Sequence, residues 1–294
     1  IYATICSNEN YVCGGLRMKF KIVGDSCTDL TIEDLKKDYF SSVPLTIDVD
    51  GYEIVDDHTF NQSDFLRRVA AFEGCPKSAC PSPDAYMKSY EGAEDVYVIT
   101  LSSHLSGSYN SAVLAKELYR EEHPEAKVHV FDSMSAASGQ RLIALLIEKY
   151  ALEGLDYGDI VEKVTKYIEE MKTVFVLESL DALRKNGRLS SVKALVANAL
   201  NIKPFMTAEK GVILQAGQAR GINKALNKMV DYIGEIGSNF DKKTVMISQC
   251  NCLDRAKNLE KVLKEKYHFK ETIIIETRGI SSLYASDGGI IVCF

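Results

Sequence analysis

Strand-like segments alternate with helix-like segments through the first half of this chain, and this alternation constrains the fold more than any other feature. The runs at 95–101 and 127–133 are short, apolar and rich in β-branched residues, which is typical of strands buried in a parallel sheet. Segments with helical periodicity follow them at 106–123 and 135–154. This order predicts a parallel, Rossmann-like α/β domain.

The second half of the chain has a different pattern. A hairpin-like stretch at 202–217 turns at Lys210-Gly211, and a glycine- and serine-rich loop is expected before the last strand at 289–294. We expect a smaller α/β domain with a mixed sheet here. Its other strand- and helix-like segments lie at 173–179, 180–187, 192–201, 222–237, 243–250, 253–267 and 271–277.

The length of 294 residues is sufficient for two domains. We place them at 18–162 and 163–294. Residues 1–17 show no clear pattern, and we expect them to be a poorly ordered extension.

Composition excludes several classes of function. The net charge of −6 and the absence of a basic run argue against nucleic-acid binding. No apolar stretch approaches the roughly 20 residues that cross a bilayer. The eight cysteines are scattered without a zinc-site spacing. We therefore expect a cytoplasmic protein without a metal or other cofactor.

Three short-range patterns predict local structure. Residues 31–40 have a near capping-box start, which predicts a helix. Asp50-Gly51 separates two alternating runs, as in a β-hairpin. Residues 77–81 are expected to form a tight loop that enters a helix at Ser82-Pro83, where serine caps and proline takes the first helical position.

Polar residues end three of the predicted parallel strands. They are Asp25-Ser26, Ser102-Ser103 and Asp132-Ser133. Ligands bind at the carboxyl ends of strands in open α/β sheets. The stretch "LSSHLSGSYNS" at 101–111, with five serines, is therefore the first candidate site.

The residues of this serine turn leave several functions open. A nucleophilic serine needs a base, but only His104 is close and no G-x-S-x-G motif is present. A phosphate loop needs more glycines than Gly107. Ser106 and the Gly107 N–H could bind a carboxylate at the helix N-terminus. The residues alone favour a simpler role, with Ser106 as the helix N-cap.

The set of turns together resembles the DegV family, the fatty-acid-binding proteins of bacterial fatty acid kinase systems. Six motifs occur in the family's order over residues 19–294. They are "KIVGDSCTDL", "SACPSP", "LSSHLSGSYNSA", "VFDSMSAASGQ", "LDALRKNGRLS" and "LNIKP". Each motif is weak alone, but six in order are a specific signal.

The resemblance implies two α/β domains with a fatty acid between them and a kinase partner that phosphorylates the bound lipid. It places the carboxylate near Ser78 and the turn containing Ser102, Ser103, Ser106 and Gly107. The protein itself would be a lipid carrier rather than an enzyme. Open alternatives are a phosphotransferase or hydrolase that uses the Ser106 turn, and a binder of another apolar carboxylate.

Two arginines and one tyrosine complete the expected site. By resemblance, Arg188 belongs to the head-group side and Arg220 faces the partner. Many family members have a histidine that reaches the carboxylate near the C-terminus. In this chain Tyr284 takes that place. A tyrosine hydroxyl can donate a hydrogen bond but carries no positive charge at neutral pH.

Overall fold

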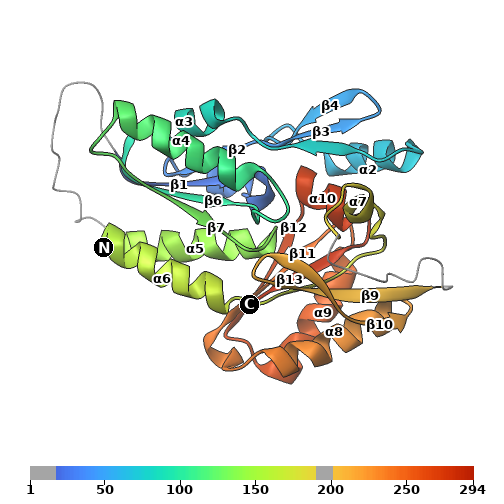
Figure 1. The fold of residues 1–294 in the computed structure, drawn as a ribbon. Helices are drawn as coiled ribbons and strands as arrows, with labels where there is room; N and C mark the ends of the chain where they lie inside the picture. Colours follow the sequence, from blue (N-terminus) through green and yellow to red (C-terminus); the bar gives the residue numbers. More distant parts are fainter. Residues whose placement is uncertain (1–17, 190–200) are drawn as a thin grey trace.

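The first domain is built on a parallel sheet, as predicted. The computed structural model describes residues 18–189 and 201–294 (Figure 1). Four strands pair in the order β2-β1-β6-β7, and every pairing is parallel. The strands are β1 (Met18–Asp25), β2 (Phe40–Val43), β6 (Ala93–Thr100) and β7 (Lys127–Asp132).

Helices cover both faces of this sheet, and alternate residues of each strand explain how. Ile22 of β1 packs toward α5 (Ser138–Leu152) and α6 (Tyr157–Glu170), whereas its neighbour Val23 packs toward α3 (Pro83–Tyr90) and α4 (Ser108–Glu122). Figure 1 shows the two helix pairs on opposite sides. A sheet buried on both faces needs consecutive apolar residues, and Val96–Ile99 of β6 are all buried.

The second sheet is mixed, which confirms the predicted class. Its order is β10-β9-β8-β13-β11-β12, and only the β11–β12 pairing is parallel. Helices α8 (Ile222–Ile236) and α9 (Leu253–Tyr267) cover one face. The strands are β8 (Thr173–Val176), β9 (Ile202–Glu209), β10 (Val212–Arg220), β11 (Thr244–Gln249), β12 (Glu271–Glu276) and β13 (Ile290–Cys293).

Helix α5 joins the two sheets. Ile143 packs in the core below the first sheet, while Leu142 packs against Met246 and Cys293 of the second. Burial on two sides explains why this helix is apolar over most of its length. Helix α6 packs on α5 in the first core. The domain boundary near residue 162 remains a prediction.

A third, small antiparallel sheet contains β3 (Thr46–Val49), β4 (Tyr52–Val55) and β5 (Lys77–Ala79). The predicted hairpin turn at Asp50-Gly51 is confirmed, with positive φ at both residues. The predicted loop at 77–81 is wrong in part, because its first three residues form β5. They take extended backbone by pairing with β3, a partner distant in sequence.

Two helix predictions need correction. The helix expected over 31–40 ends early, since α1 spans only Ile32–Leu35 and β2 follows at Phe40. The loop expected before the last strand contains α10 (Gly279–Ala285). Helix α7 (Asp181–Lys185) stops before Gly187, which has φ of +77°.

The expectations for 1–17 and for a helix at 192–201 lie wholly or almost wholly outside the described residues.

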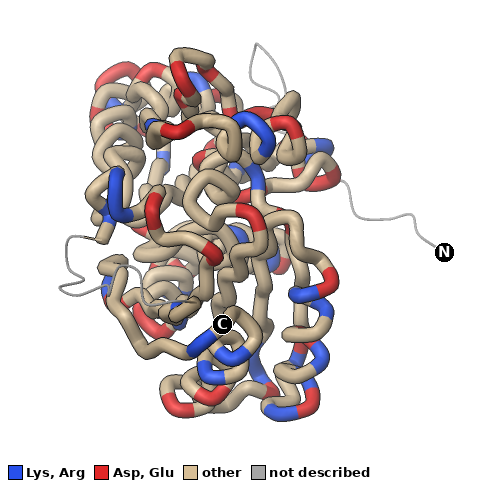
Figure 2. The backbone as a smooth tube through the Cα atoms, turned by 90° about the vertical axis from the view of Figure 1, so that its right-hand side faces the viewer, with Lys and Arg blue, Asp and Glu red and all other residues tan. Residues whose placement is uncertain are grey.

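The described helices include none long and apolar enough to cross a membrane. Figure 2 shows acidic and basic residues interspersed along the described chain, without a continuous basic stripe there.

Candidate ligand site between the two sheets

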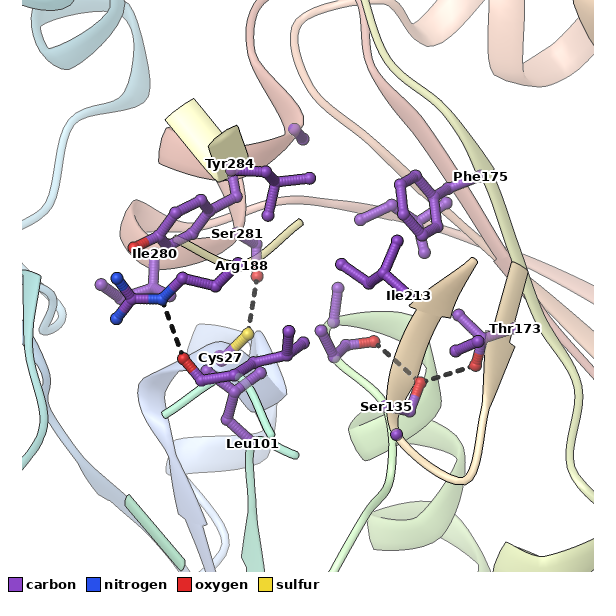
Figure 3. A pocket seen from close by; sticks show the side chains of 18 of the residues that line it. Cys27, Leu101, Ser135, Thr173, Phe175, Arg188, Ile213, Ile280, Ser281 and Tyr284 are labelled. Atoms are coloured by element: carbon purple, nitrogen blue, oxygen red, sulfur yellow. Dashed lines mark hydrogen bonds between the residues drawn. The ribbon is translucent and has the colours of Figure 1, made fainter. Parts of the chain in front are cut away.

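An apolar cavity of about 80 Å³ lies between the two large sheets. The serine turn, the loop after β7, strands β8 to β10, the segment after α7, and α10 all contribute to its wall. Figure 3 shows Arg188, Tyr284, Ile280 and Leu101 on one side and residues of the second sheet on the other. The second-sheet residues that line it include Thr173, Phe175, Ala208, Ile213 and Ile291.

The strand register explains the second-sheet wall. Ile213, Ala208, Thr173 and Cys293 are successive cross-strand partners, so they form one row on the same face. Phe175 and Ile291 lie in a neighbouring row on that face. Residues two apart in a strand share a face, so this apolar surface follows directly from strand alternation.

Two polar residues of the cavity wall, Arg188 and Tyr284, lie next to each other, and Ser78 contacts Tyr284 from outside the wall. The hydroxyls of Ser78 and Tyr284 lie 3.0 Å apart in a hydrogen bond. The Arg188 guanidinium lies 5.9 Å from the centre of the Tyr284 ring. Its Nε donates to the Leu105 carbonyl at 3.1 Å, which ties it to the serine turn. The structure thus brings together the predicted residues Ser78, Arg188 and Tyr284.

The serines of the turn mostly hold the turn itself. The buried Ser102 hydroxyl donates to the Gly211 carbonyl at 3.1 Å, which joins the turn to the tip of the β9–β10 hairpin. The Ser103 N–H donates to the Asp132 carboxylate at 3.2 Å. Two of the predicted ligand residues therefore have bonds within the protein, and their part in ligand binding remains a prediction.

The prediction that Ser106 is the N-cap of α4 is wrong by one residue. Gly107 is the N-cap of α4, while the Ser106 hydroxyl accepts the Ser108 N–H at 3.2 Å. A Cβ on Gly107 would lie only 3.1 Å from Cys80 Sγ. The missing side chain therefore lets the β5 segment approach the turn closely, and brings Ser78 toward Tyr284.

A buried carboxylate fixes the serine turn. Asp25 Oδ2 accepts the Leu101 N–H and the Ser108 hydroxyl, both at 2.7 Å, and Oδ1 accepts the Gln140 amide at 2.8 Å. Burial raises the pKa of Asp25, while these donors oppose the rise. The carboxylate therefore positions the turn and is not among the residues that line the cavity.

Two further buried carboxylates hold the start of α10. Asp56 accepts the N–H groups of Gly279 and Ile280 at 2.8 and 2.9 Å, and Asp29 accepts that of Arg278 at 2.8 Å. Burial raises the pKa of both carboxyls. This support places Tyr284, four residues beyond Ile280, at the cavity.

Arg220 is not part of this cavity. It is exposed at the end of β10 and borders a shallow surface hollow with Lys203 and Glu178. Lys203 Nζ forms an ion pair with Glu178 at 2.8 Å. The position suits a surface role, but its predicted contact with a partner remains untested.

Sequence reasoning missed the apolar wall of the site. Thr173, Phe175 and Ile213 look like ordinary strand core residues, and period-two alternation was the signal that could have shown their shared face.

The described residues contain no His/Cys/Asp/Glu group suited to a metal. They also place no histidine ring in a hydrogen bond with the Ser106 hydroxyl.

Comparison with known proteins identifies the family. A family model described as "Uncharacterised protein, DegV family" matches residues 19–294. The chain belongs to the DegV family. It is 36% identical to a DegV domain-containing protein of Streptococcus gordonii, over 94% of this chain and 98% of the relative.

Solved DegV structures share the whole fold. A DegV family protein from Ruminococcus gnavus, refined with vaccenic acid, is 46% identical with a TM-score of 0.91, and the match covers 94% of this chain and all of that one. The fatty acid kinase (Fak) B3 protein of Streptococcus pneumoniae, loaded with linoleic acid, is 33% identical with a TM-score of 0.86, covering 94% and 99%.

The buried Asp29 gives a prediction for stability against pH. Its pKa is raised in the folded protein, so its contribution to stability is full below the ordinary aspartate pKa and is lost as pH rises through the folded value. Asp29→Asn should therefore become progressively less destabilising, relative to the parent, as pH rises from about 4. The change should not exceed about 1.4 kcal/mol per pH unit, the limit for one proton.

Denaturant unfolding at several pH values measures this difference. The control is Asp64→Asn, because hydrogen bonds from Arg68 lower the pKa of this exposed carboxyl, so its effect on stability should not vary with pH above about 4. A difference between Asp29→Asn and the parent that does not vary with pH would contradict the prediction.

Proposed function

We propose that this chain binds one long-chain fatty acid between its two large sheets, with the carboxylate beside Arg188 and Tyr284 and the tail along the apolar wall. One observation carries the proposal: a largely apolar cavity between the sheets has in its wall the only guanidinium among its lining residues, Arg188, beside Tyr284, whose hydroxyl is bonded to Ser78. That polarity matches an amphiphile with a single anionic head. The fatty acids bound by similar DegV proteins support the same ligand class.

The energetics suit such a ligand. Burial contributes roughly 0.8 kcal/mol per methylene, so a tail of about 15 methylenes offers on the order of 12 kcal/mol before ordering costs. The head group can therefore be held by modest interactions. In the Ser78–Tyr284 pair one hydroxyl donates to the other, which leaves one O–H for a carboxylate, and Arg188 supplies the positive charge that a tyrosine in place of histidine lacks.

The lipid carrier would act with a kinase and perform no chemistry itself. The Fak B3 protein among the similar structures supports a kinase partner. An enzyme that uses Ser106 is the weaker alternative, because the hydroxyl of Ser106 is engaged with the helix backbone and has no base beside it among the described residues. The proposed cytoplasmic location follows from the same role.

Protein purified from bacteria should carry one non-covalently bound fatty acid. Ligand at 100 times its dissociation constant should add about 2.7 kcal/mol of stability. Native mass spectrometry followed by organic extraction identifies the lipid, and thermal unfolding with added oleate measures the stabilisation. Folded protein that yields no lipid and gains no stability from oleate would contradict the proposed function.

Loss of the head-group hydroxyls should weaken binding without unfolding the protein. Tyr284→Phe removes one hydrogen bond and should cost about 0.5–1.5 kcal/mol of binding free energy, and Ser78→Ala about 1–3 kcal/mol. Titration with a fluorescent fatty acid measures both. The matched control is Ser82→Ala, which removes only the N-cap of α3. If both variants bind the fatty acid as tightly as the parent, the carboxylate does not bind at Ser78 and Tyr284.

Arg220→Ala should separate lipid binding from lipid transfer. The exposed side chain lies outside the cavity wall, so lipid content should stay at the parent level. Loss of a rim charge should slow phosphorylation of bound lipid by the cognate kinase, since such charges mainly assist encounter. The assay is phosphate transfer from ATP. A variant that loses lipid, or that keeps full transfer, would contradict the partner-facing role.

A further inference from the structure

The three proposed head-group residues come from three segments that are distant in sequence. Ser78 lies on β5, Arg188 follows α7, and Tyr284 lies on α10. Tyr284 contacts both of the others, through the hydrogen bond to Ser78 and the guanidinium beside its ring (Figure 3). A direct link between the β5 segment and the α7 segment would fix the place of Arg188 relative to Ser78. Asn186 makes such a link.

The side chain of Asn186 binds the segment just before β5. Its amide Nδ2 donates to the Pro76 carbonyl at 3.1 Å and, within α7, to the Ala182 carbonyl at 3.0 Å. It also lies 3.3 Å from Cys75 Sγ. Pro76 is buried and stands two residues before Ser78. The amide therefore attaches the end of α7 to the backbone that carries Ser78.

The backbone of Asn186 holds the guanidinium. Its carbonyl accepts a hydrogen bond from Arg188 Nη1, while Arg188 Nε donates to the Leu105 carbonyl at 3.1 Å. Gly187, between the two residues, has φ of +77°, a backbone conformation that favours glycine. One residue thus binds the Arg188 side chain through its backbone and the β5 segment through its side chain.

These contacts close a ring. It runs from Ser78 to Tyr284, to Arg188, to Asn186, to Pro76 and back along two residues to Ser78. Directional bonds in a connected network fix distances that apolar packing leaves adjustable. Loss of the Asn186 amide opens the ring at the contact that joins the hydroxyl side to the guanidinium side.

Two other contacts do not replace this link. Ile47 pairs with Ser78 in the small sheet, which fixes β5 to β3 but not to α7. Lys185 Nζ donates to the Gly74 carbonyl at 3.4 Å, but this side chain is exposed. The bond from Asn186 to the Pro76 carbonyl is shorter and partly buried.

The separation of the two sides matters most for a charged head group. An ionised carboxylate gains a charge-assisted hydrogen bond from Arg188 and a second bond from the free O–H of the Ser78–Tyr284 pair only when both are within reach. A neutral head group, such as an alcohol, gains no charge-assisted bond of this kind from the guanidinium. Its binding should therefore depend less on where Arg188 lies.

We propose that Asn186 is a positioning residue, which holds Arg188 and the Ser78 segment at the separation that an ionised carboxylate requires. It thereby gives the site its preference for a fatty acid over a lipid with a neutral head group. This inference rests on the proposed function. Asn186 is not among the residues that line the cavity, so it acts through Arg188 and Ser78.

Palmitate and 1-hexadecanol test the proposal, because they have the same chain length and differ in the head group. Asn186→Leu keeps a side chain of similar size and removes the amide donors. It should weaken palmitate binding at least about fivefold, somewhat less than the loss of a whole charge-assisted hydrogen bond. Hexadecanol binding should stay within about twofold of the parent. Competition with a fluorescent fatty acid, on protein shown to be folded by circular dichroism, measures both affinities.

The matched control is Asn258→Leu, the same exchange at an exposed position of α9 outside the cavity wall. It should bind both lipids like the parent. Asn186→Ala provides a second variant without the amide donors, and it gives the same test should Asn186→Leu not fold.

A double-mutant cycle with Ser78→Ala separates positioning from a general effect on the fold. If Asn186 acts on the placement of Ser78, Asn186→Leu should weaken palmitate binding less in the Ser78→Ala background than in the parent, because interacting residues are not additive. Strictly additive losses would overturn the proposal.

The two lipids give three further outcomes. Equal weakening of palmitate and hexadecanol by Asn186→Leu, or no effect on either, would also overturn the proposal and leave Asn186 as an ordinary structural residue. A parent that binds palmitate no more tightly than hexadecanol would overturn the proposed selectivity while leaving lipid binding intact. A parent that binds neither lipid would instead contradict the proposed function.

Discussion

The buried carboxylate of Asp25 is the interaction on which the site depends. It sits at the end of β1 and receives hydrogen bonds from the turn after β6, from the start of α4 and from α5. A buried carboxylate is costly unless donors surround it. Those donors can reach it only when strand, turn and helices are all in place. The serine turn therefore gains its shape from Asp25 together with its own serines, of which Ser108 donates to this carboxylate.

The same principle brings the end of the chain to the site. Asp29 and Asp56, both in the first fifth of the sequence, accept the backbone N–H groups at the start of α10. Tyr284 then reaches Ser78, more than two hundred positions earlier in the chain. The hydrogen bond from the Ser102 hydroxyl to the Gly211 carbonyl joins the serine turn to the tip of the β9–β10 hairpin. Directional bonds to buried groups fix geometry that apolar packing alone would leave adjustable.

Much of this arrangement could be predicted because it depends on local pattern. The alternation of strands and helices predicted the parallel first sheet, and Asp50-Gly51 predicted the hairpin turn between β3 and β4 of the small third sheet. Predictions failed where a distant partner decides the conformation. Lys77–Ala79 became a strand because β3 lies beside it, and the helix at Gly279–Ala285 forms where Asp56 caps it from another segment.

The sequence by itself determined the α/β class, the polar turns at the ends of the parallel strands and the family to which the chain belongs, because these depend on periodicity and short motifs. It also named Ser78, Arg188 and Tyr284. Only the tertiary structure decided that these three lie together, that Ser102 bonds to the β9–β10 hairpin, and that Thr173 and Ala208 line the cavity. The reason is physical: those relations arise from strand register and from contacts between residues far apart in the chain, which no local pattern encodes.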